Sequence, residues 1–413
     1  MPAARQNILA PRFLLPRMWS KGIPVRSPCS PERAELPMSR NELRRNMRQS
    51  RGDRTPHCQR RPQANPLFDR HDMSKDDSPR ISVVIPAYRC RESIGDVLKA
   101  LLEQTLRPTE IIVVDDCSPD GLPESLSPFC GDIVYLRNRV NSGLSKTYNH
   151  GLRSATGDYV MTLHSDCILE RDYLAKVYET LSAHGDVASV SGQYLFPDFG
   201  AMQLSDQLFC VLNLLPVTHN SSTSIDAIAF IEGKADLFRR KQIEGIGFFD
   251  ENLVLTAEDQ DLSVKLRRLG FRLLQDNRAR FTSKYNGTQD SLWKVLRKQF
   301  SYAQGQMYVL AKYPADAVRP TTANRNARAA HRLSQVTFAS SVAGLVAIAF
   351  AWHPAAAIAA AMIAARAAYY LWLATPMRLP TRLLAAPMGL VSDLLYTLGL
   401  GRGLLFYAVY GRA

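Results

Sequence analysis

The chain has 413 residues and a net charge of +13, with 46% hydrophobic and 22% charged residues. This length and composition favour one large domain with a smaller additional part. The seven cysteines include no Cys-x-x-Cys pair and show no regular spacing. This pattern excludes a zinc module and a disulfide framework, and it indicates a reducing compartment.

Most of the positive charge lies at the N-terminus, because residues 1–72 hold 15 Lys and Arg against 6 Asp and Glu. Residues 1–78 are rich in Arg, Pro and Ser and lack apolar periodicity, so we expect a disordered basic leader. An organelle transit peptide is an alternative. No nucleic-acid partner is expected, because aromatic and basic residues do not interleave. Met73 precedes the first predicted strand and is a second candidate start, which would place residues 1–72 outside the native protein.

The first structured elements are predicted to form a βαβ unit. Two β-branched runs, at residues 81–85 and 111–114, flank residues 94–102, in which the apolar residues have helical spacing. This order predicts parallel strands, and ligands bind where such strands end. Asp115 and Asp116 directly follow the second strand and mark the expected pocket, although residues 115–121 also have the composition of an ordinary turn.

A third strand is predicted at residues 159–163, and it ends at His164, Ser165 and Asp166. An acid again lies at the carboxyl end of a strand. With this segment the chain resembles glycosyltransferase family 2, whose members have the GT-A fold. The matching motifs occur in the family's order: Val-Val-Ile-Pro-Ala-Tyr88, Val-Val-Asp-Asp-Cys-Ser-Pro-Asp120, Asn141-Ser-Gly143 with Asn149-His-Gly151, Ala155-Thr-Gly-Asp158, His-Ser-Asp166, Gly247-Phe-Phe-Asp250 and Glu-Asp259. The resemblance implies an α/β domain over residues 79–310, with a Rossmann-like mixed sheet flanked by helices.

The resemblance assigns the first two motifs to the base of a nucleotide-sugar donor. Pro86, Ala87 and Tyr88 end the first strand, and Tyr88 is the expected stacking platform for the base. Asp116, with Asp115, is expected to accept the imide N–H of a uracil or thymine, which favours a UDP- or dTDP-sugar. An ordinary half-buried tyrosine at a strand end is the alternative for Tyr88.

Three further residues are expected around the nucleoside and diphosphate, again by resemblance. They are Asn141, Lys146 and Asn149, and they lie in the segment that similar enzymes wrap around this part of the donor. Lys146 could equally be a solvated loop charge.

The family normally has Asp-x-Asp at the metal site, and this chain has His164, Ser165 and Asp166 instead. The resemblance assigns Asp166 as the ligand of a divalent cation, Mg²⁺ or Mn²⁺, with the donor phosphates supplying further oxygens. Imidazole is a poorer ligand for Mg²⁺ than for softer metals, so His164 leaves the metal preference open. A histidine bonded to backbone at the strand end is the alternative for His164.

Residues 258–270 have the pattern of a helix, with apolar residues on one face and a glycine at the end. The resemblance assigns Asp259 as the general base that removes the proton of the acceptor hydroxyl in a single, inverting displacement. Glu258 is expected to support the site, and Asp261 is expected to face solvent. Ordinary capping of a helix N-terminus is the alternative for the pair Glu258 and Asp259.

After the catalytic domain the composition changes, and a C-terminal membrane region of helices is expected at residues 333–413, behind a basic linker at residues 311–332. Residues 333–352 carry no charge and are long enough to cross a bilayer. A second apolar run contains Arg366, which is costly in a membrane unless it is paired. A third run, residues 383–409, could span or lie along the interface. A soluble helical subdomain is the alternative for the whole region.

Residues 291–305 have the pattern of an amphipathic helix with a basic face, which suits a position at a membrane surface. The basic flanks of the first two apolar runs favour a catalytic domain on the cytoplasmic side of the cytoplasmic membrane. We therefore expect an inverting glycosyltransferase that moves a sugar from a nucleotide donor to a lipid-linked or cell-envelope glycan acceptor. The alternatives are a polyprenyl-phosphate sugar synthase and a non-catalytic nucleotide-binding subunit of a glycan assembly complex.

Overall fold

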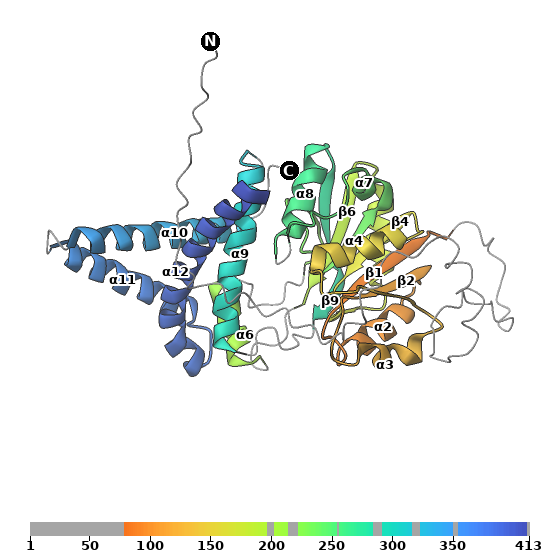
Figure 1. Cartoon of the computed structure of the whole chain (residues 1–413), viewed down its shortest axis with the longest axis horizontal. Helices are drawn as coiled ribbons and strands as arrows, with labels where there is room; N and C mark the ends of the chain where they lie inside the picture. The colour runs from red at the N-terminus through yellow and green to blue at the C-terminus, as the bar shows by residue number, and fades with distance from the viewer. Residues whose placement is uncertain are drawn as a thin grey trace, which may run out of the picture. The chain divides into compact units, whose positions relative to one another are not determined.

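The computed structural model describes residues 78–195, 202–213, 222–253, 256–283, 291–315, 323–349 and 354–410. The expected leader at residues 1–78 therefore lies outside the described residues, apart from Ser78. The described part contains a mixed sheet with helices on both faces, followed by long apolar helices, as predicted (Figure 1).

The sheet has the order β3-β2-β1-β4-β8-β6-β9-β5, and β7 pairs with β9. The strands span Ile81–Ala87 (β1), Glu110–Asp115 (β2), Val134–Arg137 (β3), Tyr159–Leu163 (β4), Cys167–Leu169 (β5), Val187–Tyr194 (β6), Ile225–Ile228 (β7), Ala235–Arg239 (β8) and Arg272–Ser283 (β9). Strands β1 to β4 are mutually parallel, whereas β8 is antiparallel to β4 and β6. The carboxyl ends of β1 to β4 and the start of β8 therefore meet at one edge of the sheet.

Within the described residues, seven helices and a short 3₁₀ segment cover the sheet or continue from it. They span Ile94–Leu102 (α2), Leu122–Leu126 (α3), Ser127–Phe129 (η1), Leu144–Ser154 (α4), Tyr173–Ala183 (α5), Leu204–Leu212 (α6), Arg240–Gly245 (α7) and Glu258–Arg268 (α8). The predicted βαβ unit is confirmed, because β1 pairs in parallel with β2 and α2 lies between them in the chain.

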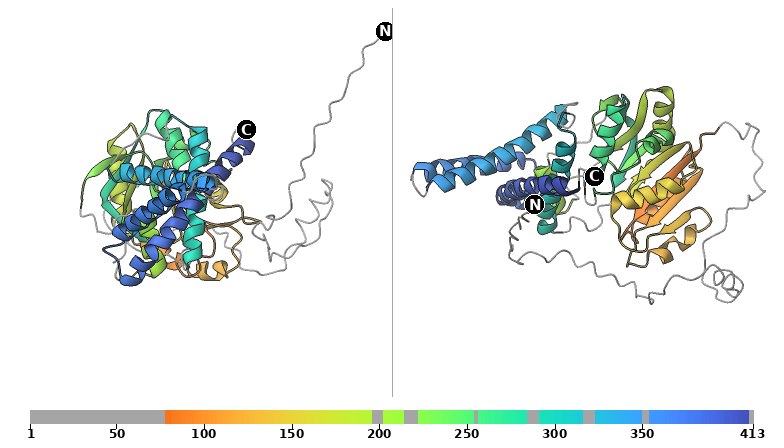
Figure 2. Two further views of the ribbon diagram at one scale, coloured as in Figure 1. Left: turned by 90° about the vertical axis from the view of Figure 1, so that its left-hand side faces the viewer. Right: turned by 45° about the horizontal axis from the view of Figure 1, so that its top comes forward.

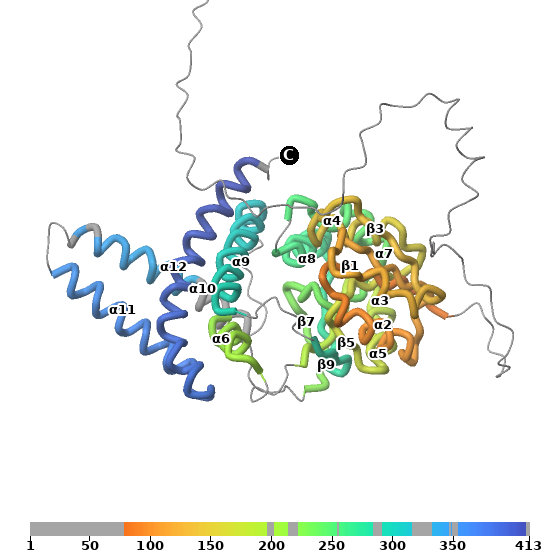
Figure 3. The backbone as a smooth tube through the Cα atoms, turned by 60° about the horizontal axis from the view of Figure 1, so that its bottom comes forward, coloured from red at the N-terminus to blue at the C-terminus, as the bar shows by residue number. Residues whose placement is uncertain are grey.

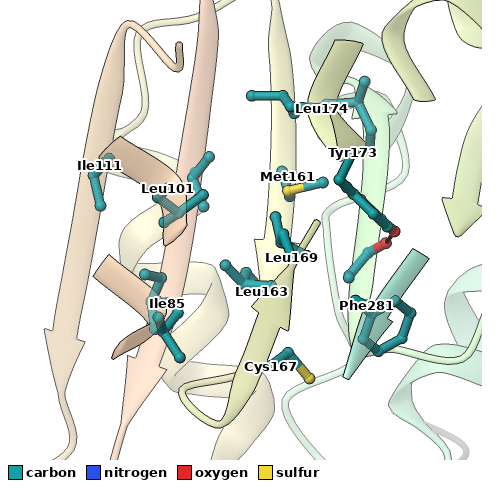
Figure 4. Packing of buried hydrophobic residues seen from close by; sticks show 14 of the residues in the cluster. Ile85, Leu101, Ile111, Met161, Leu163, Cys167, Leu169, Tyr173, Leu174 and Phe281 are labelled. Carbon is teal, nitrogen blue, oxygen red and sulfur yellow. Dashed lines mark hydrogen bonds between the residues drawn. The ribbon is translucent and has the colours of Figure 1, made fainter. Parts of the chain in front are cut away.

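Two apolar clusters occupy the two faces of the sheet. On one face, Ile85 and Met161 pack against side chains of α2, α3 and α5, among them Leu101 and Leu174 (Figure 4). On the other face, α4, α7 and α8 cover the opposite side of the same strands. Since both faces are covered, the strands read in sequence as nearly continuous apolar runs.

The described C-terminal residues form four helices, which span Leu292–Lys312 (α9), Ala323–Ala349 (α10), Pro354–Leu373 (α11) and Leu379–Tyr410 (α12). Helices α10 and α11 run side by side (Figure 2), and α12 lies against α9, with α6 beside them (Figure 3). Among the described residues, α11 and residues 379–409 of α12 are long and apolar enough to cross a membrane. The apolar part of α10 is shorter, at residues 333–346.

Two expected boundaries differ from the structure. Helix α10 begins at Ala323, so the second half of the expected basic linker is helical. Helix α9 runs on to Lys312 and shares an apolar cluster with α6, α11 and α12, so it belongs to the C-terminal helices as much as to the catalytic domain. The composition predicted the position of the apolar run, but helix α10 begins earlier, in the polar residues that precede this run.

Arg366 is paired, as its position in an apolar helix requires. Its guanidinium lies 2.9 Å from the carboxylate of Asp393 on α12 and donates to the hydroxyl of Ser334 on α10. Tyr370 also donates to Asp393, at 2.6 Å. This buried group joins three helices and satisfies the charge of Arg366 within the protein.

Candidate active site

The expected donor-binding residues meet at the edge of the sheet where β1, β2 and β4 end. Ala87 and Asp115 lie opposite each other in the paired strands, and the backbone N–H of Asp116 donates to the Ala87 carbonyl at 2.8 Å. Pro86 and Ala87 are buried in β1, so they form the floor of this edge. Tyr88 directly follows and is 43% exposed, which leaves its ring available to a base.

Asp116 organises the loop after β3. One of its carboxylate oxygens accepts from the Asn138 side chain and the Ser142 backbone N–H, both at 2.8 Å, and the other accepts from the Gly143 backbone N–H at 2.9 Å. The positive φ of Gly143, 85°, lets the chain turn there into α4. The carboxylate therefore holds residues 138–143 beside the strand ends.

Asp115 is fully buried, and its carboxylate is held by three groups. It accepts from the hydroxyl of Tyr135 at 2.6 Å and from the Ser118 backbone N–H at 2.7 Å, and it lies 3.2 Å from the Arg137 guanidinium. These contacts place Asp115 beneath the edge, as a support for Asp116 and the loop.

Asn141 and Lys146 are exposed near the start of α4, as expected for residues that could approach a donor. Asn149 differs from expectation, because its side chain is fully buried. Its amide donates to the Phe249 carbonyl at 3.0 Å and accepts from the Phe249 backbone N–H at 3.0 Å. Asn149 therefore holds the segment around Phe249 and does not face the donor side.

The turn between β4 and β5 brings together side chains suited to a metal ion. The candidate ligand atoms of His164, Asp166 and Cys167 lie within 4.8 Å of one another. Asp166 also accepts from the hydroxyl of Ser283, at 2.8 Å, at the end of β9. Ser165 contributes its carbonyl, which accepts from the Ser93 hydroxyl at 2.9 Å and fixes the turn to the start of α2.

A divalent cation fits this turn. Burial lowers the pKa of His164 to about 4, against the opposing charge of Asp166, so the imidazole is neutral at pH 7. Its Nε2 is buried without a hydrogen-bond partner among the described residues. Burial raises the pKa of the Cys167 thiol, so this side chain stays protonated and is a weak ligand. One neutral imidazole nitrogen with one carboxylate suits Mn²⁺ better than Mg²⁺.

Asp259 reaches the same edge from α8. It lies half-buried against Gly233, where a Cβ would be 3.0 Å from the Asp259 Cβ. The next residue, Lys234, accepts a backbone hydrogen bond from His164 at 2.8 Å. Gly233 and Lys234, just before β8, therefore join the turn that holds His164 and Asp166 to Asp259, the expected catalytic acid.

Glu258 is almost completely buried at the first position of α8. Burial and, second to it, the nearby charge of Asp259 raise its pKa from 4.5 to about 8. Glu258 is therefore held mainly in its protonated form at pH 7. The different roles expected for Glu258 and Asp259 stay a prediction.

Two acids near the site were missed or misplaced by the sequence. Asp236 on β8 is fully buried, and burial raises its pKa to about 7, with Asp259 contributing. An acid among the otherwise apolar residues 235–238 was the signal that could have found it. Asp261 was expected to face solvent, but it is fully buried, with Lys265 and Lys312 each 2.8 Å from its carboxylate.

Comparison with known proteins identifies the catalytic domain. Residues 82–247 match the family model described as Glycosyl transferase family 2. Poly-beta-1,6-N-acetyl-D-glucosamine synthase of Staphylococcus aureus (strain COL) is 25% identical over 243 residues, which are 58% of this chain and 58% of that protein. The enzyme of the same name from Staphylococcus epidermidis is 24% identical over 234 residues, 56% of each chain. The chain thus matches somewhat more than half the length of these relatives.

A solved structure supports the fold. The mannosyltransferase PcManGT from Pyrobaculum calidifontis, determined in complex with GDP-Man and Mn²⁺, superposes with a TM-score of 0.53. The two chains are 22% identical, and the superposition covers 78% of this chain and 88% of the mannosyltransferase. At this identity the likeness concerns the fold. Residues 82–247 therefore carry a domain of glycosyltransferase family 2, and the described sheet has a GT-A-like fold.

Proposed function

We propose that this protein is a membrane-attached, metal-dependent, inverting glycosyltransferase that moves a sugar from a nucleotide donor to a lipid-linked or cell-envelope glycan acceptor. One observation carries the proposal: Gly233 and Lys234 join Asp259 to the turn that holds His164 and Asp166. A base and a candidate metal site on one edge of the sheet are what a single displacement at a sugar carbon requires.

The donor is proposed to bind with its base over Tyr88 and its diphosphate toward the turn of His164 and Asp166. The carboxylate of Asp166 and the unpartnered Nε2 of His164 would hold a divalent cation. When bound, such a cation stabilises negative charge on the departing diphosphate. The carboxylate of Asp116, which lies next to Ala87 and so near the proposed nucleobase site at Tyr88, suits the imide of uracil or thymine. We therefore propose a UDP- or dTDP-sugar as donor.

Asp259 is proposed to accept the proton of the acceptor hydroxyl. The hydroxyl oxygen then forms a bond to the anomeric carbon as the bond from that carbon to the diphosphate breaks. The attack comes from the face opposite the diphosphate, so the configuration inverts. The raised pKa of Glu258 beside it limits the second negative charge next to Asp259, the proposed base.

The membrane attachment is proposed from the apolar helices α11 and α12. Arginines follow α11 at Arg378 and Arg382, and further arginines lie at the start of α10, so both ends of the α10–α11 pair that adjoin the rest of the chain are basic. This distribution favours a catalytic domain on the cytoplasmic side. The names of the staphylococcal relatives, poly-beta-1,6-N-acetyl-D-glucosamine synthases, support a polysaccharide as the product.

The test is a donor panel with the full chain in detergent. UDP-, dTDP-, GDP- and CDP-sugars are each added with Mn²⁺, Mg²⁺ or a chelator, and thermal stability and donor hydrolysis are measured. A bound donor raises the free energy of unfolding by about 2.7 kcal/mol at a hundredfold excess over Kd. We expect stabilisation and hydrolysis with a uridine or thymidine donor and Mn²⁺. Stabilisation without hydrolysis by any donor would favour a non-catalytic subunit and overturn the proposal.

A further inference from the structure

Helix α9 lies between α12 and α8, the helix that carries Asp259. Its contact with α12 is made through glycines of α12. A Cβ added at Gly399 would approach the Phe300 carbonyl oxygen closer than 3.0 Å, and one at Gly403 would do the same to the Gln304 carbonyl oxygen. These glycines are four residues apart and so share one face of α12. Gly401, between them, has no atom within 4 Å of its Cβ position.

The other side of α9 touches the start of α8. A Cβ added at Gly305 would lie closer than 3.0 Å to the Thr256 carbonyl oxygen and 3.0 Å from the Ala257 Cβ. The Thr256 hydroxyl donates to the Ser301 carbonyl of α9 at 3.0 Å. Ala257 has a φ of 72°, a left-handed conformation that is strained for a residue with a side chain and directly precedes Glu258 and Asp259.

Lys312 adds a charged contact at the end of α9. Its ammonium lies 2.6 Å from the carboxylate of Asp250 and 2.8 Å from that of Asp261 in α8. Asp250 also accepts from the hydroxyl of Tyr308, one turn earlier in α9, at 3.0 Å. The carboxylate of Asp261 is fully buried, so loss of its partner Lys312 would strongly destabilise the protein. Lys312 therefore holds α9 against α8.

We propose that α9 is the element that positions Asp259, with Lys312 and Gly305 as positioning residues, and that α12 controls the rate of sugar transfer through its glycine contact with α9. The inference rests on the proposed role of Asp259 as base. None of these residues needs to touch the donor. A misplacement of about 1 Å at a reacting group can cost about a hundredfold in rate, so contacts at this distance from the chemistry are sufficient to govern it.

The test uses the full chain with matched variants. Gly403→Ala places a methyl group against the Gln304 carbonyl, whereas Gly401→Ala makes the same chemical change on the same helix in open space. Lys312→Met removes the charged contact with α8, and Lys312→Arg keeps the charge. Two readouts are measured on each: hydrogen exchange of residues 256–268, and kcat with donor Kd.

We expect Gly403→Ala and Lys312→Met to increase exchange at residues 256–268 and to lower kcat by about 10- to 100-fold, with donor Kd within about twofold of the parent. Gly401→Ala should behave like the parent, and Lys312→Arg should recover much of the loss. Unchanged exchange and unchanged kcat in Gly403→Ala would overturn the inference even if Lys312→Met fails to fold. If the parent transfers no sugar, the proposed function fails, and the exchange of residues 256–268 still decides whether α12 acts on α8.

Discussion

Gly233 lies against the side chain of Asp259, so that a Cβ at Gly233 would be 3.0 Å from the Asp259 Cβ and 3.6 Å from one of its carboxylate oxygens. Gly233 has a φ of 69°, which other residues rarely adopt. The backbone can therefore pass close to Asp259, while the carbonyl of the adjacent Lys234 accepts from the backbone N–H of His164. A glycine at this position lets the proposed base Asp259 and the turn of His164 and Asp166 lie against the same backbone segment.

The first prediction concerns Asp259 itself. Asp259→Asn keeps the shape of the side chain and loses the proton acceptor, so we expect kcat to fall by about 10²–10⁴-fold with little change in donor Kd. Single-turnover transfer and a donor titration measure the two quantities. Glu258→Gln is the control and should be milder, because Glu258 is already protonated. Near-normal transfer by Asp259→Asn would point to a phosphate acceptor that needs no base, or to a helix cap.

The second prediction separates the two residues of the metal turn. Asp166→Asn should abolish the Mn²⁺-dependent stabilisation by the donor, because the carboxylate is the charged ligand. His164→Ala should weaken this stabilisation without removing it. Ser283→Ala, which removes only the hydrogen bond to Asp166, is the matched control and should retain metal-dependent binding. Equal and complete loss in Asp166→Asn and His164→Ala would show that His164 is as essential a ligand as Asp166 and would contradict this prediction.

The third prediction concerns pH and Glu258. Its pKa is raised from 4.5 to about 8 by burial, so the unfolded chain releases this proton at a lower pH than the folded protein. Glu258 therefore costs stability as the pH rises from about 4.5 to 8. Glu258→Gln removes this cost, and its thermal stability relative to the parent should increase between pH 5 and pH 8, by roughly 1–3 kcal/mol. Asp236 has a similar shift in both proteins and cancels in the difference. Parallel stability curves would contradict the burial argument.

The fourth prediction tests the exposed ring of Tyr88. Tyr88→Leu should weaken donor binding by about 1–3 kcal/mol, the usual contribution of one stacked base. Tyr88→Phe keeps the ring and should bind the donor nearly as well as the parent. Calorimetric titration with the donor measures both. Equal affinity in all three proteins would make Tyr88 an ordinary surface tyrosine.

The fifth prediction concerns the ion pair of the C-terminal helices. Arg366→Met leaves Asp393 buried without its cation, and we expect a loss of about 3–5 kcal/mol in stability. The double variant Arg366→Met with Asp393→Leu removes both charges and should lose less than the single one. Thermal unfolding in a fixed detergent gives the comparison. A double variant that is less stable than Arg366→Met would indicate that the pair stabilises the protein by more than the compensation of the two charges.

The sequence predicted the parts of the fold that depend on local pattern. The first strands and α2 follow from apolar runs and helical spacing, and the acids at strand ends follow from the parallel order that those runs imply. The burial of Asp261 could not be predicted in this way, because its partner Lys312 is 51 residues further along the chain. The family resemblance placed Asn149 at the donor, and the local pattern could not show its bond to Phe249, which lies 100 residues away.

Strand β5 has a consequence for the order in which this protein assembles. Among the described strands it pairs only with β9, in a register that sets Cys167 opposite Ser283, and the hydrogen bond from Ser283 to Asp166 spans 117 residues of sequence. During synthesis, Asp166 cannot gain this partner before residue 283 has left the ribosome. The contact is therefore among the latest in the sheet to form, since non-local pairing is slow. The turn that holds His164 and Asp166 is therefore completed only shortly before helices α10 to α12 are synthesised.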